Sequence, residues 1–191
     1  PPRSTLSSSS AASDVYKRQV HNNNKALVID PSESGPLIKT LEKLNLKLKY
    51  ILNTHHHFDH IDGNLTLKEK YKCKIIGFID DKKRIPGIDI CLKNEEIFKE
   101  GDFKFKTYHT PGHTSGHICY HFFNDKILFT GDTLFSLSCG RLFEGTYEDM
   151  FRSLSLIKTF DKETLIYCGH EYLSLIHISE PTRLLSIGVG G

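Results

Sequence analysis

The sequence lacks several features that would assign it to a special class of protein. No stretch approaches the roughly 18 consecutive apolar residues that a membrane-spanning helix needs, so we expect no membrane association. The formal net charge over 191 residues is only +2, which argues against nucleic acid as a partner. No internal repeat is visible, so a solenoid is not expected.

Cysteine is sparse, and no two cysteines form a C-x-x-C pair. The five cysteines are at positions 73, 91, 119, 139 and 168. An odd number without such a pair favours reduced thiols over a disulfide framework. We interpret Cys139 and Cys168 as small packing residues, and a metal-ligand role for Cys168 is the alternative.

Histidine, by contrast, is concentrated in one segment. Residues 54–60 read THHHFDH, which places four imidazoles and one carboxylate within six positions. Imidazole and carboxylate both suit zinc and related metals. At the end of a strand His55 and His57 would point the same way, and a turn would let Asp59 and His60 face a second point nearby. The segment can therefore supply two adjacent metal ions.

Three further segments place ligand-type side chains in loops that contain glycine. They are TPGHTSGH (110–117), FTGDT (129–133) and YCGHEY (167–172). Each reads as a loop next to a strand, and such loops are where chemistry usually occurs. We expect His56, His109 and His117 to pack or to orient ligands through hydrogen bonds, with direct ligation by His117 as the alternative.

Apolar periodicity and turn residues predict an α/β chain. Strands are expected at 26–30, 49–53, 74–79, 103–109, 118–123, 126–130 and 165–168, with a hairpin across Asn124-Asp125. Helices are expected from Gly35-Pro36 onward, at 63–71 and at 148–160. Residues 80–95 read as irregular, with a turn at Pro86-Gly87.

These motifs resemble the metallo-β-lactamase superfamily and, within it, glyoxalase II, the hydroxyacylglutathione hydrolases. The matching segments are THHHFDH (54–60), TPGHTSGHICY (110–120), FTGDTLF (129–135), CGRLFEGT (139–146) and CGHEY (168–172). The first, third and last are shared across the superfamily, whereas CGRLFEGT joined to GDTLF singles out glyoxalase II. The resemblance implies a four-layer αββα sandwich with the ligands gathered at one edge.

The resemblance also implies a centre of two divalent metal ions, with zinc expected and iron or manganese as alternatives. The first metal would be bound by His55, His57 and His113. The second would be bound by Asp59, His60 and His170, and Asp132 would bridge the two. A hydroxide between the metals would be the nucleophile, so Asp59 and Asp132 are the implied catalytic residues.

The implied reaction is hydrolysis of an S-(2-hydroxyacyl)glutathione thioester, such as S-D-lactoylglutathione to glutathione and D-lactate. Arg141, Phe143 and Tyr172 align with glutathione contacts of the family. Arg141 replaces a lysine seen in some members, and Phe143 lacks the hydroxyl of a tyrosine seen in others. The alternatives are a glutathione persulfide dioxygenase of the same fold and a non-catalytic metal-binding fragment. By family resemblance we expect a cytoplasmic monomer.

The two ends of the chain read differently from its middle. SSAASDVYKRQ near the start and LSLIHISEPTR near the end resemble translated sequencing-adapter sequence, so residues 1–19 and 173–191 are predicted to be non-native. Residues 20–172 would then be a partial catalytic domain without an early strand and without the family's C-terminal helical domain. A native serine-rich linker and a native C-terminal strand are the alternative. We expect such a fragment to bind metal weakly and to turn over poorly.

Overall fold

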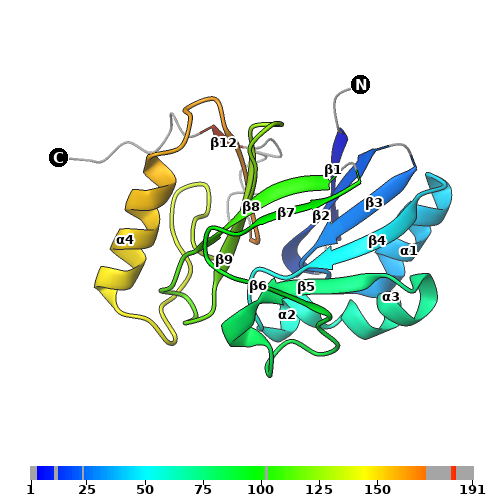
Figure 1. Cartoon of the computed structure of the whole chain (residues 1–191), viewed down its shortest axis with the longest axis horizontal. Coiled ribbons are helices and arrows are strands. Elements are labelled where there is room, and N and C mark those ends of the chain that lie inside the picture. Colours follow the sequence, from blue (N-terminus) through cyan, green and yellow to red (C-terminus); the bar gives the residue numbers. More distant parts are fainter. Residues whose placement is uncertain (1–3, 11–12, 23, 102, 171–181, 184–191) are drawn as a thin grey trace. The chain divides into compact units, whose positions relative to one another are not determined.

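The structure is a computed structural model that describes residues 4–10, 13–22, 24–101, 103–170 and 182–183. The chain divides into two compact units, residues 1–93 and 94–191. Each unit is built around one six-stranded sheet (Figure 1). This α/β architecture with two sheets agrees with the expected fold class.

The sheet of the first unit has the strand order β1-β2-β3-β4-β5-β6. Its strands are β1 (Ser4–Ser10), β2 (Ser13–Asn22), β3 (Lys25–Ile29), β4 (Lys47–Leu52), β5 (Lys74–Phe78) and β6 (Ile90–Leu92). The first three strands pair antiparallel, and β3 to β6 pair parallel. Parallel neighbours need crossover connections, which α1 (Ser34–Lys43) and α3 (Asn64–Tyr71) supply after β3 and β4.

The helices of this unit are held to the sheet by one apolar core. Leu37 and Leu41 lie one turn apart on α1, and both are fully buried together with Leu67 of α3. They pack with sheet residues such as Val28 and Ile51. Because this core fixes the carboxyl ends of β3 and β4, it also fixes the loops that leave those ends.

The sheet of the second unit has the order β12-β11-β10-β9-β8-β7. Its strands are β7 (Ile97–Glu100), β8 (Phe103–His109), β9 (Ile118–Phe122), β10 (Ile127–Gly131), β11 (Leu165–Cys168) and β12 (Thr182–Arg183). Strands β7 to β10 pair antiparallel in chain order, and β11 pairs parallel to β10. The crossover between β10 and β11 contains α4 (Tyr147–Lys158), whose Ile157 packs with Leu128 and Ile166.

Helix α4 begins directly after the last residue of the CGRLFEGT motif. Thr146 is the N-cap: its hydroxyl accepts a hydrogen bond from the Asp149 amide at 3.1 Å, and its amide donates to the Asp149 carboxylate at 2.9 Å. This is a reciprocal cap of the kind that starts a helix sharply. The hydrogen bonds from the backbone and the hydroxyl of Thr146 lower the pKa of Asp149. The motif therefore ends at a fixed point of the fold.

The structure confirms every predicted strand and helix to within a few residues, and corrects the sequence analysis at short elements. Residues 80–95 are not wholly irregular, because they include β6 and the end of the 3-10 helix η1 (Ile79–Asp81). Strand β7 and helix α2 (Phe58–Ile61) were also not expected. Each has only three or four residues, too few for apolar periodicity to show.

The predicted origin of residues 1–19 and 173–191 stays a prediction, as does the absence of an early strand and of a C-terminal domain. The predicted substrate contact Tyr172 lies outside the described residues. Within the ranges that the structure describes, no helix is long and apolar enough to cross a membrane.

Candidate metal centre

The first unit presents four ligand-type side chains just after β4. His55 and His57 lie in the loop that leaves the strand, and α2 carries Asp59 and His60. The ring centroid of His55 is 4.7 Å from that of His57 and 4.2 Å from that of His60. Potential ligand atoms of His55 lie within 4.8 Å of those of both rings. The predicted turn after the strand is thus the short helix α2.

A buried carboxylate orients His60 from behind. Asp30, which is 3% exposed, places Oδ2 at 3.0 Å from His60 Nδ1. The opposite ring nitrogen, Nε2, lies 3.6 Å from Asp59 Oδ2. Asp30 also accepts hydrogen bonds from the amide and hydroxyl of Thr54, at 2.7 and 2.6 Å. A proton on Nδ1 would leave Nε2 as the metal-binding atom, which is how an outer carboxylate usually acts.

Asp30 is absent from the site residues predicted from the sequence. The signal that could have identified it is an acid directly after an apolar strand, the same signal that marks Asp132. Its backbone φ of 48° is left-handed, which aspartate tolerates better than most residues.

Replacing Asp30 with asparagine should weaken metal binding by about 10- to 100-fold, because the amide removes the negative charge beside His60 Nδ1 and one of the two oxygens that accept from Thr54. The measurement is metal retained during dialysis against a competing chelator. Asp80→Asn, at an exposed position of the same unit, is the control. Equal retention by both variants would show that Asp30 does not support the ligand.

His56 faces away from the ligand side, as strand alternation predicts. Its Nδ1 lies 3.3 Å from Oδ2 of the fully buried Asp81, whose Oδ1 accepts a hydrogen bond from Arg84 Nε at 2.9 Å. A buried carboxylate needs such pairing. His55 and His57 therefore lie on the side of the chain with the other ligand-type residues, whereas His56 is held on the opposite side by Asp81.

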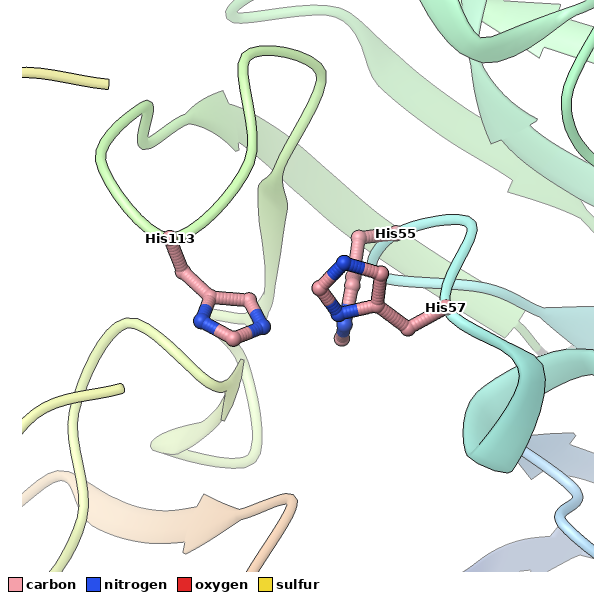
Figure 2. Close-up of side chains that lie close together, drawn as sticks. All are labelled: His55, His57 and His113. Carbon is pink, nitrogen blue, oxygen red and sulfur yellow. The ribbon is translucent and has the colours of Figure 1, made fainter. Parts of the chain in front are cut away.

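In the second unit, one carboxylate lies between two imidazoles. Asp132 follows β10, His113 lies in the loop after β8, and His170 follows β11. Asp132 Oδ2 is 3.4 Å from Nε2 of His113 and 3.4 Å from Nε2 of His170. Both nitrogens are of the type that binds metal, and one carboxylate oxygen lies at the same distance from each of them. Figure 2 shows the three imidazoles of the expected first metal set, His55 and His57 after β4 and His113 after β8.

The CGRLFEGT segment braces the His113 loop mainly through its backbone. His113 Nδ1 lies 2.6 Å from the Arg141 carbonyl oxygen, which fixes Nε2 as the outward nitrogen. The Phe143 amide donates to the His113 carbonyl at 3.1 Å. The Glu144 carboxylate accepts hydrogen bonds from the amide and the hydroxyl of Ser115, both at 2.8 Å.

Two predicted substrate contacts lie beside His113. The Phe143 ring is exposed and packs edge to face against His113, with centroids 5.3 Å apart. The Arg141 guanidinium carbon lies 5.3 Å from the Phe143 ring centroid, within the range of a cation–π contact. A cation and an apolar surface thus stand next to a ligand-type histidine.

The donor set fits a divalent metal of the zinc, iron or manganese type. It consists of imidazole nitrogens and carboxylate oxygens, which suit all three metals. Across the described part of the chain, no cysteine belongs to a group of three or more potential ligands, so the alternative ligand Cys168 has no support. Cys168 is buried at the end of β11.

Comparison with known proteins agrees with this reading of the motifs. The chain is 58% identical over 149 residues to hydroxyacylglutathione hydrolase from Pelagibacter ubique (strain HTCC1062), covering 78% of this chain and 62% of the relative. The chain therefore spans less than two thirds of the length of that relative.

Solved structures support the fold. BLEG-1 B3 metallo-beta-lactamase has a TM-score of 0.84 at 24% identity, covering 96% of this chain and 95% of that chain. ETHE1 from Myxococcus xanthus has a TM-score of 0.83 at 25% identity, covering 95% and 80%. Residues 19–170 match the metallo-beta-lactamase superfamily as a sequence family. The expected fold class is confirmed, and the chain belongs to the metallo-beta-lactamase superfamily.

Proposed function

We propose that the ligand-type residues bind two divalent metal ions, most simply zinc. The first ion would be held by His55, His57 and His113, the second by Asp59, His60 and His170, with Asp132 as the bridge. The observation that carries this proposal is the Asp132 oxygen equidistant from two imidazole nitrogens. The buried supports of His60 and His113 add to it, since metal-binding histidines are normally oriented in this way.

Two bound divalent ions supply Lewis acidity and lower the pKa of bound water toward neutrality. The chain's own residues would position the reactants. Asp59, whose side chain is about half exposed, can accept a hydrogen bond from a water molecule. The adjacent rings of His55 and His60 are fully buried, which excludes bulk water from their side of the centre.

The proposed reaction is hydrolysis of an S-(2-hydroxyacyl)glutathione thioester. Support comes from the name of the relative at 58% identity and from the CGRLFEGT motif. Glutathione carries carboxylates, and Arg141 offers a cation for one of them beside the apolar face of Phe143. Tyr172 stays a predicted substrate contact.

The test is to load the purified chain with zinc and to follow loss of S-D-lactoylglutathione. Loss of the thioester that stops on chelation and returns on re-addition of metal would support the proposal. Oxygen uptake with glutathione persulfide, without thioester hydrolysis, would support the dioxygenase alternative. Two bound zinc ions without turnover would support a non-catalytic metal-binding fragment.

Arg141→Gln should raise KM for the thioester by about 10-fold or more, the size expected for the loss of a hydrogen bond to a charged group. The kcat value should change less, because the proposed contact is with a carboxylate of glutathione and not with the reacting thioester. Arg141→Lys should recover part of the loss, since it keeps the charge but not the planar geometry. Arg152→Gln, at an exposed position of α4, is the control. An equal KM for all three variants would show that Arg141 does not contact the substrate.

A further inference from the structure

His117 is a fully buried histidine that the proposed metal set does not use. It is the last residue of the loop that carries His113, and it directly precedes β9. The loop is closed at its base, because the Thr110 amide donates to the His117 carbonyl oxygen at 2.8 Å. The backbone of His117 is therefore held in place. The two nitrogens of its imidazole face different parts of the unit.

One of these nitrogens contacts the backbone of the proposed bridging residue. The Asp132 amide donates a hydrogen bond to His117 Nε2 at 3.0 Å. A backbone amide can only donate, so Nε2 must accept and cannot carry a proton. The ring is thus the tautomer with its proton on Nδ1.

The other nitrogen is matched to that tautomer. His117 Nδ1 lies 3.0 Å from the Thr133 hydroxyl and 3.1 Å from the Thr110 hydroxyl, and either oxygen can accept the proton. Both threonines are fully buried, and the two hydroxyls are themselves 3.0 Å apart. Because both ring nitrogens have partners in this network, the alternative of direct metal ligation by His117 is disfavoured.

The network links the two loops of the unit that carry metal-type ligands. Thr110 and His117 bound the loop of His113, whereas Asp132 and Thr133 form the turn after β10. We propose that His117 is a positioning residue: its neutral imidazole holds the Asp132 turn at a fixed distance from the His113 loop, so that the carboxylate can bridge two metals. This inference rests on the proposed function, because it takes Asp132 as a ligand.

The test compares His117→Leu with His117→Gln in the full chain. Leucine keeps volume but removes both hydrogen bonds, whereas the glutamine carbonyl can accept from the Asp132 amide. Zinc bound per chain, measured at fixed free zinc, should fall for His117→Leu, with at least one site weakened by about 10-fold or more. His117→Gln should recover most of that loss. The thermal midpoint of each metal-free variant separates weakened binding from unfolding.

His121, four residues after His117 and within β9, provides the matched control. Burial, and then the charge of Lys106, lower its pKa, so it too is a partly buried neutral histidine. It packs on Phe160, with ring centroids 4.7 Å apart. His121→Leu should leave zinc binding at the wild-type level.

A second measurement is independent of metal. Nitrogen NMR of the metal-free wild-type chain should find the His117 proton on Nδ1. A proton on Nε2, or equal zinc binding by His117→Leu and wild type, would overturn the inference. A wild-type chain with the expected tautomer that binds no zinc would instead overturn the proposed metal centre, and with it the role of His117.

Discussion

Asp132→Asn should remove most of the bound metal and lower thioester turnover by more than about 100-fold. This exceeds the 10- to 100-fold range for residues that only support a ligand, because the carboxylate is proposed to bind both ions. Asparagine keeps the shape of the side chain, so its hydrogen bond from the backbone amide to His117 can persist. The loss of bound metal and of turnover would then result from removal of the negative charge and of the second carboxylate oxygen.

The measurement is metal content per chain together with the turnover rate at saturating zinc. Asp125→Asn, in the turn between β9 and β10, is the control for an aspartate outside the centre. The metal-free Asp132→Asn chain should melt no lower than the wild type, because removing the charge relieves the desolvation of a buried carboxylate. Two tightly bound ions in this variant would contradict the bridging role.

The ligand-type residues were predictable from sequence because metal binding restricts residue type. Only a few side chains supply nitrogen or carboxylate donors, so their spacing in 54–60 and 110–117 is itself a signal. The long strands and helices were predictable for a similar reason, since burial of Leu37 and Leu41 on one face of α1 imposes a period. Short elements such as β6 and β7 carry no such period.

The residues that hold the ligand-type side chains in place were harder to predict from the sequence. Asp30 lies 24 residues before Thr54, to which it is hydrogen-bonded, and 30 residues before His60, and no local pattern joins them. The proposed role of His117 depends on the backbone amide of Asp132 in another loop, which any residue type except proline would supply. The sequence predicts that His117 packs or orients a ligand, which stays a prediction, but the hydrogen-bond partner of its Nε2 could be identified only from the fold.

The CGRLFEGT motif shows more clearly that contacts made by the backbone are hard to predict from sequence. Its side chains suggest substrate contacts, and Arg141 and Phe143 do lie beside His113. Its backbone also positions that histidine, through the Arg141 carbonyl and the Phe143 amide. A backbone contact restricts the residue type at a position only where a side chain would block that contact. In this motif the restricted residue is a glycine.

Gly140→Ala should therefore disrupt the centre even though the change adds one methyl group. A Cβ at this position would collide with the Asp132 carbonyl oxygen and would lie 2.7 Å from His113 Nδ1. The Gly140 amide already donates a hydrogen bond to that carbonyl at 2.8 Å. The two chain segments therefore cannot separate without losing this bond. Overpacking of this kind typically costs about 1–3 kcal/mol, and here both displaced groups belong to proposed ligands.

The expected result is a lower thermal midpoint for the metal-free chain together with a loss of bound zinc. Gly35→Ala in the first turn of α1 is the matched control, because a Cβ there would meet nothing within 4 Å. Alanine favours a helix over glycine by up to about 1 kcal/mol, so this control should be neutral or stabilising. Retention of two zinc ions by Gly140→Ala would mean that the Asp132 turn can move while keeping its ligands. A loss of zinc with an unchanged midpoint would instead place the whole effect at His113 and Asp132, where the added methyl group would displace ligands without loosening the fold.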